Sequence, residues 1–330
     1  MKEKNKGFTL VELLAVIVIL ALIALIATPI ILNVINDAKK QAAKDSAYGY
    51  MDAVEKYIVS SELEDESIPD GIYRVEDLNK KISVKGSTPD NGIIKIENKE
   101  VKKYDIGIDG YAVSNGEVKK VSTTKKFENG TAVYYNPEKG KECKSSEAVS
   151  TTGTKNGCMK WYVFNDKEGN ATVNVILDHN TTANVSYNST GNNSEMKEVK
   201  IKLEEDTKDW KNTARLITAN EVAKITKHPT FNVNKENQDW FYLDSNNITL
   251  TVNSTNKSKY AWLFDYTNEC TSYGCNVSDS STWGYWTSSP YKGNSTQAWR
   301  VVRNGYLGGN GVIFTGDGIR PVITISKSNV

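Results

Sequence analysis

Hydrophobic and polar residues are distributed unevenly along this chain, and the most apolar stretch lies near its start. The 24 residues at positions 13–36 contain no charged side chain. A helix needs about 20 apolar residues to cross the hydrocarbon core of a bilayer, which is about 30 Å thick. Residues 13–32 supply that length, so the pattern predicts a membrane-spanning helix.

The helical pattern continues beyond the apolar run, where apolar or small residues recur at the spacing of one helical face. These positions are Ile31, Ile35, Ala38, Ala42, Ala47, Tyr50, Met51, Val54, Tyr57 and Ile58. We expect one helix over residues 8–60, about 80 Å long at about 1.5 Å per residue. Its second half is amphipathic and should pack on a globular head.

Short alternating runs separated by turn residues fill residues 61–140. The runs at 93–96, 104–108 and 111–113 have the alternation of strands, and Asn115-Gly116 suits a two-residue hairpin loop. The pattern predicts a small antiparallel sheet on the amphipathic half of the helix.

The composition changes at Cys143, because all 7 Trp, all 4 Cys and both His residues lie at or after that position. This change indicates a second domain over residues 141–330. Strand patterns occur in it at 161–164 and 171–177, and the domain should be a loop-rich mixture of short elements.

One helix start inside this domain is marked by its own sequence. Residues 214–225 resemble a strand followed by a helix, with Thr218 as N-cap and Glu221 completing a capping box. The whole pattern therefore predicts an α+β fold: a long N-terminal helix, a small antiparallel sheet and a mixed C-terminal domain.

The charge balance changes the functional picture in one respect. The chain has 41 Lys and Arg against 40 Asp and Glu, a net charge of +1. Without an overall positive field, electrostatic binding to nucleic acid is not expected.

The N-terminal charges indicate how the chain lies in a membrane. Lys2, Lys4 and Lys6 precede the apolar run and should stay cytoplasmic, which places the residues after 36 outside the membrane. An ordinary secretory signal peptide is the alternative. Its apolar region is shorter and carries no carboxylate such as Glu12, and the helical pattern here continues past any cleavage point.

Two residues of the apolar segment are unusual for a membrane helix. A carboxylate such as Glu12 is costly there unless it finds a partner, so it indicates function. If the chain is cut between Gly7 and Phe8, the new α-amino group lies about one helical turn away and can neutralise Glu12 of the next subunit. Pro29 removes a backbone hydrogen bond, so we expect a kink or a locally melted stretch.

Residues 6–12 read KGFTLVE and precede a long apolar helix. This segment resembles the N-terminus of type IV prepilins and the related pseudopilins over about 55 residues. The resemblance implies a leader at residues 1–7, cut after Gly7 by a prepilin peptidase, and N-methylation of Phe8. It also implies that Glu12 guides docking between subunits and that the helix unwinds near Pro29 in filaments.

The end of the chain carries a second resemblance. The segments GYWTSSP at 284–290, AWRVV at 298–302 and GIRPVITI at 318–325 resemble bacterial domains related to the C-type-lectin and formylglycine-generating-enzyme folds. The first segment is one residue longer than that family's W-x-S-P pattern. The resemblance implies a lectin-like domain over 141–330 and transfers no activity.

Four cysteines on the outer side of a membrane favour disulfides, with three connectivities open. Proximity in sequence favours Cys143 with Cys158 and Cys270 with Cys275. Zinc is disfavoured because neither pair has the C-x2-C spacing. We expect no bound metal or other cofactor.

Catalytic chemistry is not indicated. Asp178 and His179 are adjacent, but no nucleophile can be assigned to them, and a structural histidine at the end of a strand is the favoured interpretation. A catalytic site built from distant residues such as His179, Asp265 and Asp317 would make the chain a membrane-tethered enzyme, which we keep as an alternative. We expect that the protein is not an enzyme.

The sequence is best interpreted as a prepilin-like structural subunit of a type IV pilus-type surface filament. It would sit in membrane lipid as a single-pass protein with a cytoplasmic N-terminus, and would then assemble with itself and other pilin subunits. The C-terminal domain would face outward and bind a surface glycan or protein ligand. A pseudopilin of a type II secretion or DNA-uptake machine is the alternative within the same family.

Overall fold

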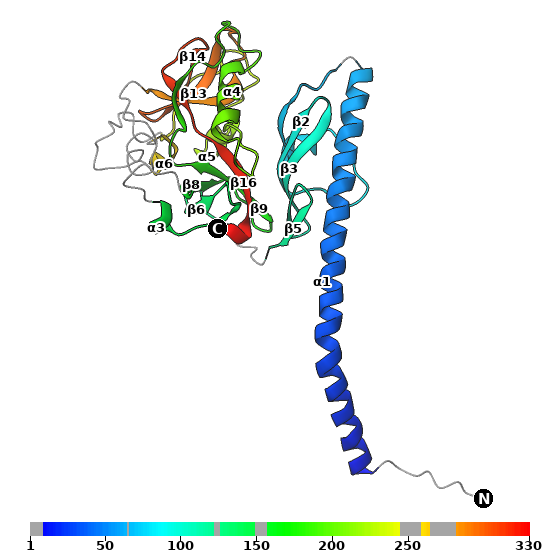
Figure 1. Cartoon of the computed structure of the whole chain (residues 1–330). Coiled ribbons are helices and arrows are strands. Elements are labelled where there is room, and N and C mark those ends of the chain that lie inside the picture. Colours follow the sequence, from blue (N-terminus) through cyan, green and yellow to red (C-terminus); the bar gives the residue numbers. More distant parts are fainter. Residues whose placement is uncertain (1–8, 65, 122–125, 149–156, 245–258, 265–281) are drawn as a thin grey trace, which may run out of the picture.

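A computed structural model describes residues 9–64, 66–121, 126–148, 157–244, 259–264 and 282–330. The chain has the predicted α+β architecture, in which one long helix precedes antiparallel sheets and a strand-rich C-terminal region. Figure 1 shows the first sheet lying between the helix and the C-terminal region.

The long helix α1 spans Leu10–Leu63, so it ends three residues later than expected. It is helical throughout, including Pro29, so of the kink or locally melted stretch expected there, the melted stretch is absent. A single proline removes one backbone hydrogen bond. Because helix propagation is cooperative, the turns before and after Pro29 keep the segment helical.

Only the second half of α1 is covered by other parts of the molecule. Its buried residues are Ala43, Ala47, Tyr50, Met51, Val54, Ile58 and Ser61. The predicted stripe is confirmed from Ala47 onward, but Ile31, Ile35, Ala38 and Ala42 are exposed. The sheet of the head reaches only the last six turns of the helix, so the buried stripe begins at Ala43 rather than in the apolar run.

The head sheet contains five antiparallel strands in the order β1-β2-β3-β4-β5. The strands are β1 (Gly71–Arg74), β2 (Asn91–Glu97), β3 (Glu100–Ile108), β4 (Tyr111–Ser114) and β5 (Glu117–Lys120). Asn115 and Gly116 form the predicted two-residue loop, both with positive φ, and Ser114 pairs with Glu117 across it. A short helix, α2 (Val75–Leu78), follows the edge strand β1.

The C-terminal region contains two more sheets. The first, entirely antiparallel, has the order β16-β9-β8-β6-β7, and the second has the order β10-β15-β12-β13-β14-β11 with one parallel pair, β12 and β15. The first sheet contains β6 (Ala132–Asn136), β7 (Lys141–Glu142), β8 (Met159–Phe164), β9 (Thr172–Leu177) and β16 (Val322–Ser326). The second contains β10 (Thr182–Val185), β11 (Phe241–Tyr242), β12 (Gly284–Pro290), β13 (Gln297–Val302), β14 (Tyr306–Gly311) and β15 (Asp317–Ile319).

The strand β6 shows where the sequence-based boundary at residues 140 and 141 departs from the structure. It pairs with β8, and Val133 lies opposite Trp161. The sheet of the C-terminal region therefore begins before residue 141. Strand β6 has no composition signal of its own, since the Trp and Cys residues begin only after it.

Short helices complete the C-terminal region: α3 (Ser145–Ala148), α4 (Lys197–Asp206), α5 (Ala219–Ile225) and α6 (Ala261–Phe264), with a 3-10 turn at Lys327–Asn329. The predicted capping box of α5 is confirmed: Thr218 Oγ1 accepts from the Glu221 backbone N–H at 3.1 Å, and the Glu221 carboxylate accepts from the Thr218 N–H at 2.9 Å.

Candidate functional site

The first turn of α1 holds the carboxylate that the sequence analysis assigned to assembly. Glu12 Oε2 accepts hydrogen bonds from the backbone N–H and the hydroxyl of Thr9, both at 2.8 Å, and the Glu12 N–H donates to Thr9 Oγ1 at 3.3 Å. This is a complete capping box. Gly7 and Phe8 lie outside the described residues, and the helix begins directly after them.

The first half of α1 is apolar on every side and exposed on every side. The helix is long and apolar enough to cross a membrane, and none of its most apolar window is buried inside the molecule. Leu14, Ile19 and Leu25, for example, are all more than half exposed. A helix that is apolar all round is stable in lipid or among other helices, and not in water. This surface indicates a membrane-anchored protein.

The face of the head sheet opposite α1 contacts the C-terminal region through polar groups. Asp105 on β3 is fully buried there and accepts from the Ser114 hydroxyl at 2.5 Å and from the Thr213 N–H at 3.2 Å. Burial raises the pKa of Asp105 to about 6, although these two hydrogen bonds and the charge of Lys103 oppose that rise.

A chain of amide groups continues this contact toward the middle of the sheet. Asn91 at the start of β2 donates to the Thr172 carbonyl at 3.2 Å, and Asn174 on β9 donates to Asn91 Oδ1 at 3.3 Å. The Thr324 hydroxyl on β16 in turn donates to Asn174 Oδ1 at 2.9 Å. All four residues are buried, so the contact between the head and the C-terminal region is polar. The amides of Asn91 and Asn174 are paired, whereas the Thr172 hydroxyl has no hydrogen-bond partner among the described residues.

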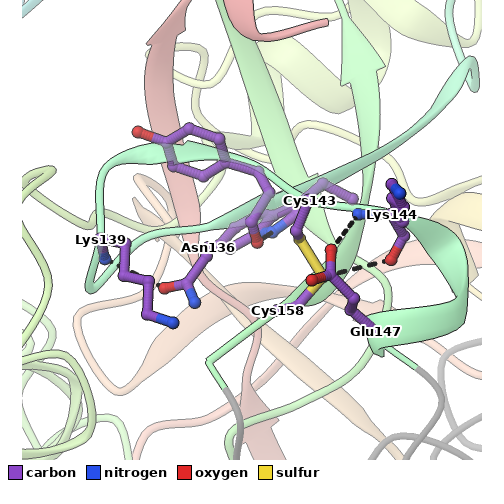
Figure 2. Close-up of a disulfide and its surroundings, with 8 residues drawn as sticks. Asn136, Lys139, Cys143, Lys144, Glu147 and Cys158 are labelled. Atoms are coloured by element: carbon purple, nitrogen blue, oxygen red, sulfur yellow. Dashed lines mark hydrogen bonds between the residues drawn. A yellow bond between two sulfur atoms is a disulfide. The ribbon is translucent and has the colours of Figure 1, made fainter.

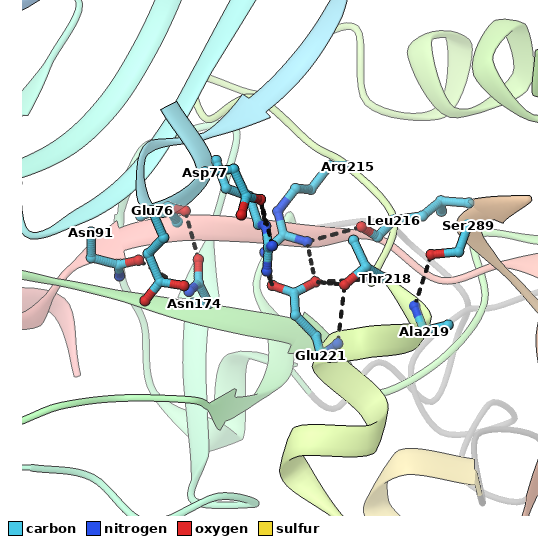
Figure 3. A network of polar contacts seen from close by, with 12 residues as sticks. Glu76, Asp77, Asn91, Asn174, Arg215, Leu216, Thr218, Ala219, Glu221 and Ser289 are labelled. Carbon is cyan, nitrogen blue, oxygen red and sulfur yellow. Dashed lines mark hydrogen bonds and ion pairs between the residues drawn. The ribbon is translucent and has the colours of Figure 1, made fainter. Parts of the chain in front are cut away.

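A buried ion pair lies at the edge of the same contact (Figure 3). Arg215 donates to both carboxylate oxygens of Glu221, from Nη1 at 2.8 Å and from Nη2 at 2.7 Å. Arg74 of the head lies 3.4 Å from the same carboxylate and also pairs with Asp77. Burial alone would raise the pKa of Glu221, but the Arg215 charge and hydrogen bonds, assisted by Arg74, lower it to about 2.

A cleft of about 1080 Å³ opens between the head and the C-terminal region beside this network. The edge strand β1 forms one wall, with Ile72 and Tyr73, and the opposite wall includes Leu203 and Trp210. Arg215 lines the cleft as well. The two parts of the molecule thus touch through polar groups on one side and leave an open, partly apolar space on the other.

The first predicted disulfide is confirmed (Figure 2). Cys143 follows β7 and is bonded to Cys158, which precedes β8, and their Cα atoms are 6.1 Å apart. Closing a loop of about 15 residues in this way stabilises a fold by about 3 kcal/mol in the chain-entropy account. Cys270 and Cys275, the second predicted pair, lie outside the described residues.

The residues considered for catalysis make separate structural contacts. Asp178 and His179 follow β9, are buried, and contact each other through the carboxylate Oδ1 and the ring Nδ1. Asp317 accepts from Arg300 Nη1 at 3.0 Å, and burial raises its pKa to about 6 against the effect of Arg300. Asp265 lies outside the described residues. Within the described part of the chain, no three His, Cys, Asp or Glu side chains group together to hold a metal.

Comparison with known families locates two matches on the chain. Residues 2–28 match the prokaryotic N-terminal methylation motif, and residues 164–327 match a domain of unknown function (DUF6273). No curated protein and no solved structure matched the chain.

The methylation motif defines the N-terminal part of this chain as type IV pilin-like. Such a motif implies processing by a prepilin peptidase and assembly with other pilin subunits. The matched C-terminal family does not confirm the lectin-like or formylglycine-generating-enzyme-like fold that the sequence resembles.

Proposed function

We propose that this protein is a structural subunit of a type IV pilus-type surface filament and that its C-terminal region is displayed outward for adhesion or recognition. The observation that carries the proposal is the exposed apolar half of α1, most of which lies within the match to the methylation motif at residues 2–28. The second half of α1 is buried against the head, so one helix has an apolar exposed half and a half that packs inside the protein.

The apolar half of α1 needs a partner at every stage. In a bilayer, lipid covers it, and the single span holds the protein in the membrane. In a filament, the same surface would pack against the equivalent helices of neighbouring subunits. Lipid tails and neighbouring helices are both apolar, so the helix loses little apolar contact when it moves from the membrane into a filament. The same residues therefore serve in both places.

Glu12 would select the register of that packing. An unpaired carboxylate among apolar helices is costly, and a free α-amino group at Phe8 of a neighbouring subunit is a partner of opposite charge. The capping box with Thr9 holds Glu12 at the very start of the helix, where such an amine would arrive. The C-terminal region lies on the far side of the head sheet from α1, so burying α1 in a filament core would leave it outside (Figure 1).

Sheared surface filaments test the assembly role of Glu12. We expect Glu12→Ala and Glu12→Gln to insert into the membrane normally and to yield few or no filaments, because both remove the charge. Thr9→Ala is the matched control, since it removes the cap and keeps the carboxylate; it should assemble far better than either Glu12 variant. Normal filament yield from Glu12→Gln would contradict the charge-pairing role.

The processing step has its own measurement. Mass spectrometry of the mature N-terminal peptide should find a chain that begins at methylated Phe8, and an intact Met1 would contradict the proposal. Protein retained in the envelope without extended fibres would instead favour a pseudopilin of a secretion or DNA-uptake machine. The proposal assigns binding rather than catalysis to the C-terminal region.

A further inference from the structure

Three aromatic side chains gather at the outer edge of the six-stranded sheet, and we call them the aromatic platform. They are Trp240, which precedes the edge strand β11, Tyr242 on β11 and Tyr306 on β14. The Trp240 and Tyr306 rings are nearly parallel, with centroids 6.4 Å apart and planes at 26°. Tyr242 lies directly opposite Tyr306 in the strand register, with ring centroids 6.0 Å apart.

Two glycines of β14 lie next to these rings. A Cβ atom on Gly308 would lie 2.6 Å from Cε2 of Tyr306 and 3.5 Å from Cδ2 of Trp240, and one on Gly309 would lie 3.4 Å from Nε1 of Trp240. Both rings therefore lie close to Gly308, which has no side chain. A Cβ atom on Gly309 would point to the opposite face of the strand, so Trp240 lies beside the edge of β14. A larger residue than glycine at 308 would displace the Tyr306 ring.

Two members of the platform face solvent, unlike most large aromatic residues of this region, and Tyr306 is half-buried. Trp240 is 55% exposed and Tyr242 is 38% exposed, whereas Trp161, Trp286 and Trp299 are at most 1% exposed. Phe241, between Trp240 and Tyr242, points the other way and packs on Phe231, with ring centroids 5.5 Å apart. Strand alternation thus anchors β11 in the core through one face and presents the platform on the other.

We propose that the aromatic platform binds a glycan, with neighbouring pyranose rings stacked on Trp240 and Tyr306. A pyranose whose hydroxyl groups are all equatorial has two flat faces of C–H groups, which lie well on an aromatic ring. Two nearly parallel rings with centroids 6.4 Å apart can contact successive sugars of an extended chain. The two phenol hydroxyls at the ring edges can hydrogen-bond the sugar hydroxyls. This inference rests on the proposed outward display of the C-terminal region.

The size and place of the platform favour a glycan over a protein or a lipid surface. A stable protein interface buries about 800 Å² on each partner, far more than three side chains offer. Strand β14 lies at the end of the C-terminal region away from the start of α1 (Figure 1), so membrane lipid around that helix does not reach it.

Binding of all-equatorial oligosaccharides to the full chain tests the site. The protein should be purified in a zwitterionic detergent without sugar groups and titrated with cellohexaose and chitohexaose by calorimetry. We expect at least one of the two to bind. Trp240→Ala should weaken that binding about tenfold or more, as loss of a central aromatic anchor does, and Tyr306→Ala should weaken it comparably.

Trp283→Ala is the matched control, because Trp283 is 50% exposed in the same sheet region but stacks on Arg303 and lies outside the platform. It should bind as the wild type does. The inference is overturned if neither oligosaccharide binds, if Trp240→Ala binds unchanged, or if Trp283→Ala weakens binding equally. Near-ultraviolet circular dichroism identifies any variant that has lost its fold, and Trp240→Phe then replaces Trp240→Ala, with an expected intermediate affinity.

The outcome can be separated from that of the filament proposal. Sheared filaments that form normally and bind neither oligosaccharide would overturn the platform alone. Oligosaccharide binding by a protein that forms no filaments would overturn the filament proposal and leave the platform supported.

Discussion

The two faces of the head sheet are covered in opposite ways. On one face, Tyr50, Val54 and Ile58 of α1 join a continuous apolar core with residues such as Ile94 and Ile106. On the other face, the sheet meets the C-terminal region through buried carboxylates, amides and an ion pair, including Asp105, Asn91 and the Glu221 network. Alternation along β3 separates the two sets, because Ile106 points to α1 and Asp105 points away.

This difference shows two ways of joining parts of one chain. Apolar contacts are non-directional and tolerate small shifts, so a helical stripe of the right spacing is enough to form one. A buried polar contact needs each donor opposite its acceptor, and an unmet partner costs about 1–3 kcal/mol. Changes of side-chain volume should therefore destabilise the contact that faces the helix. Changes of charge or of a hydrogen-bond partner should destabilise the contact with the C-terminal region.

The largest effect is expected from Arg215→Met on the polar side. Removing Arg215 leaves the buried Glu221 carboxylate with the more distant Arg74 at 3.4 Å and the hydrogen bonds of its capping box. Loss of one partner of a buried pair costs about 3–5 kcal/mol of unfolding free energy. Urea unfolding followed by tryptophan emission measures the loss. Lys56→Met is the control, because the exposed Lys56–Asp52 pair should contribute well under about 1 kcal/mol. Equal losses for the two variants would contradict the buried network's role.

On the apolar side, Ile58→Ala should lower the unfolding free energy by about 2–5 kcal/mol, because it leaves a cavity in the helix-facing core. The neighbouring Val59 is 57% exposed, so Val59→Ala should change the unfolding free energy by less than about 0.5 kcal/mol. The same urea experiment compares the two. An Ile58→Ala variant as stable as Val59→Ala would show that α1 does not depend on this contact.

The pH dependence of stability separates the faces further. Burial raises the pKa of Asp105 from its ordinary 3.8 to about 6, so the folded state binds this proton more tightly than the unfolded state. Its contribution is therefore most favourable below about pH 4 and declines as the pH rises to about 6, by at most about 3 kcal/mol.

Asp105→Asn keeps the shape and removes the titration. Asp90 and Asp317 have pKa values raised to about 6 by burial as well, so both proteins should lose stability over this range. The wild type should lose more unfolding free energy between pH 4 and 6 than Asp105→Asn does. The difference between the two slopes of unfolding free energy against pH then gives the contribution of Asp105. Identical slopes in urea titrations at pH 4, 5 and 6 would refute the assignment.

The smallest effect is expected at Gly107, where Thr172 of the C-terminal region lies close to the head sheet. A Cβ atom there would lie 2.5 Å from Asp90 Oδ1 and 3.0 Å from Thr172 Oγ1. Gly107→Ala should cost about 1 kcal/mol, near the low end for overpacking, because the Asp90 side chain can move aside. Gly71→Ala, whose nearest neighbour is 3.7 Å away, is the control in the same sheet, and an equal response of both variants would argue against the close approach.

Local sequence patterns predicted a large part of this molecule. The helix, the Asn115-Gly116 hairpin and the capping box of α5 each depend on residues a few positions apart, and the structure confirms them. The Cys143–Cys158 disulfide was favoured by proximity in the sequence and is also confirmed. The start of the buried stripe at Ala43 was not predicted, since it depends on how far the sheet reaches along α1.

The candidate sites also divide into those that local sequence reveals and those that join distant segments. Glu12 was found from sequence because a carboxylate stands out in an apolar run. The ion pair of Arg74 with Glu221 and the aromatic platform were not found, because each joins segments far apart in the chain. Trp240 beside Tyr306 had no signal in the sequence beyond a general richness in aromatic residues.

What the sequence alone determined is the character of each segment: an apolar surface suited to a membrane at residues 13–32, a stripe that packs on a sheet in the second half of α1, and the pairing of Cys143 with Cys158. Periodicity and composition carry that information because they are averages over neighbouring residues. Only the tertiary structure decided that β6 joins β8, that Asp105 meets Thr213, and that Trp240 lies beside Tyr306. Those contacts depend on strand order and register, which place single atoms from distant segments together and leave no repeating trace along the chain.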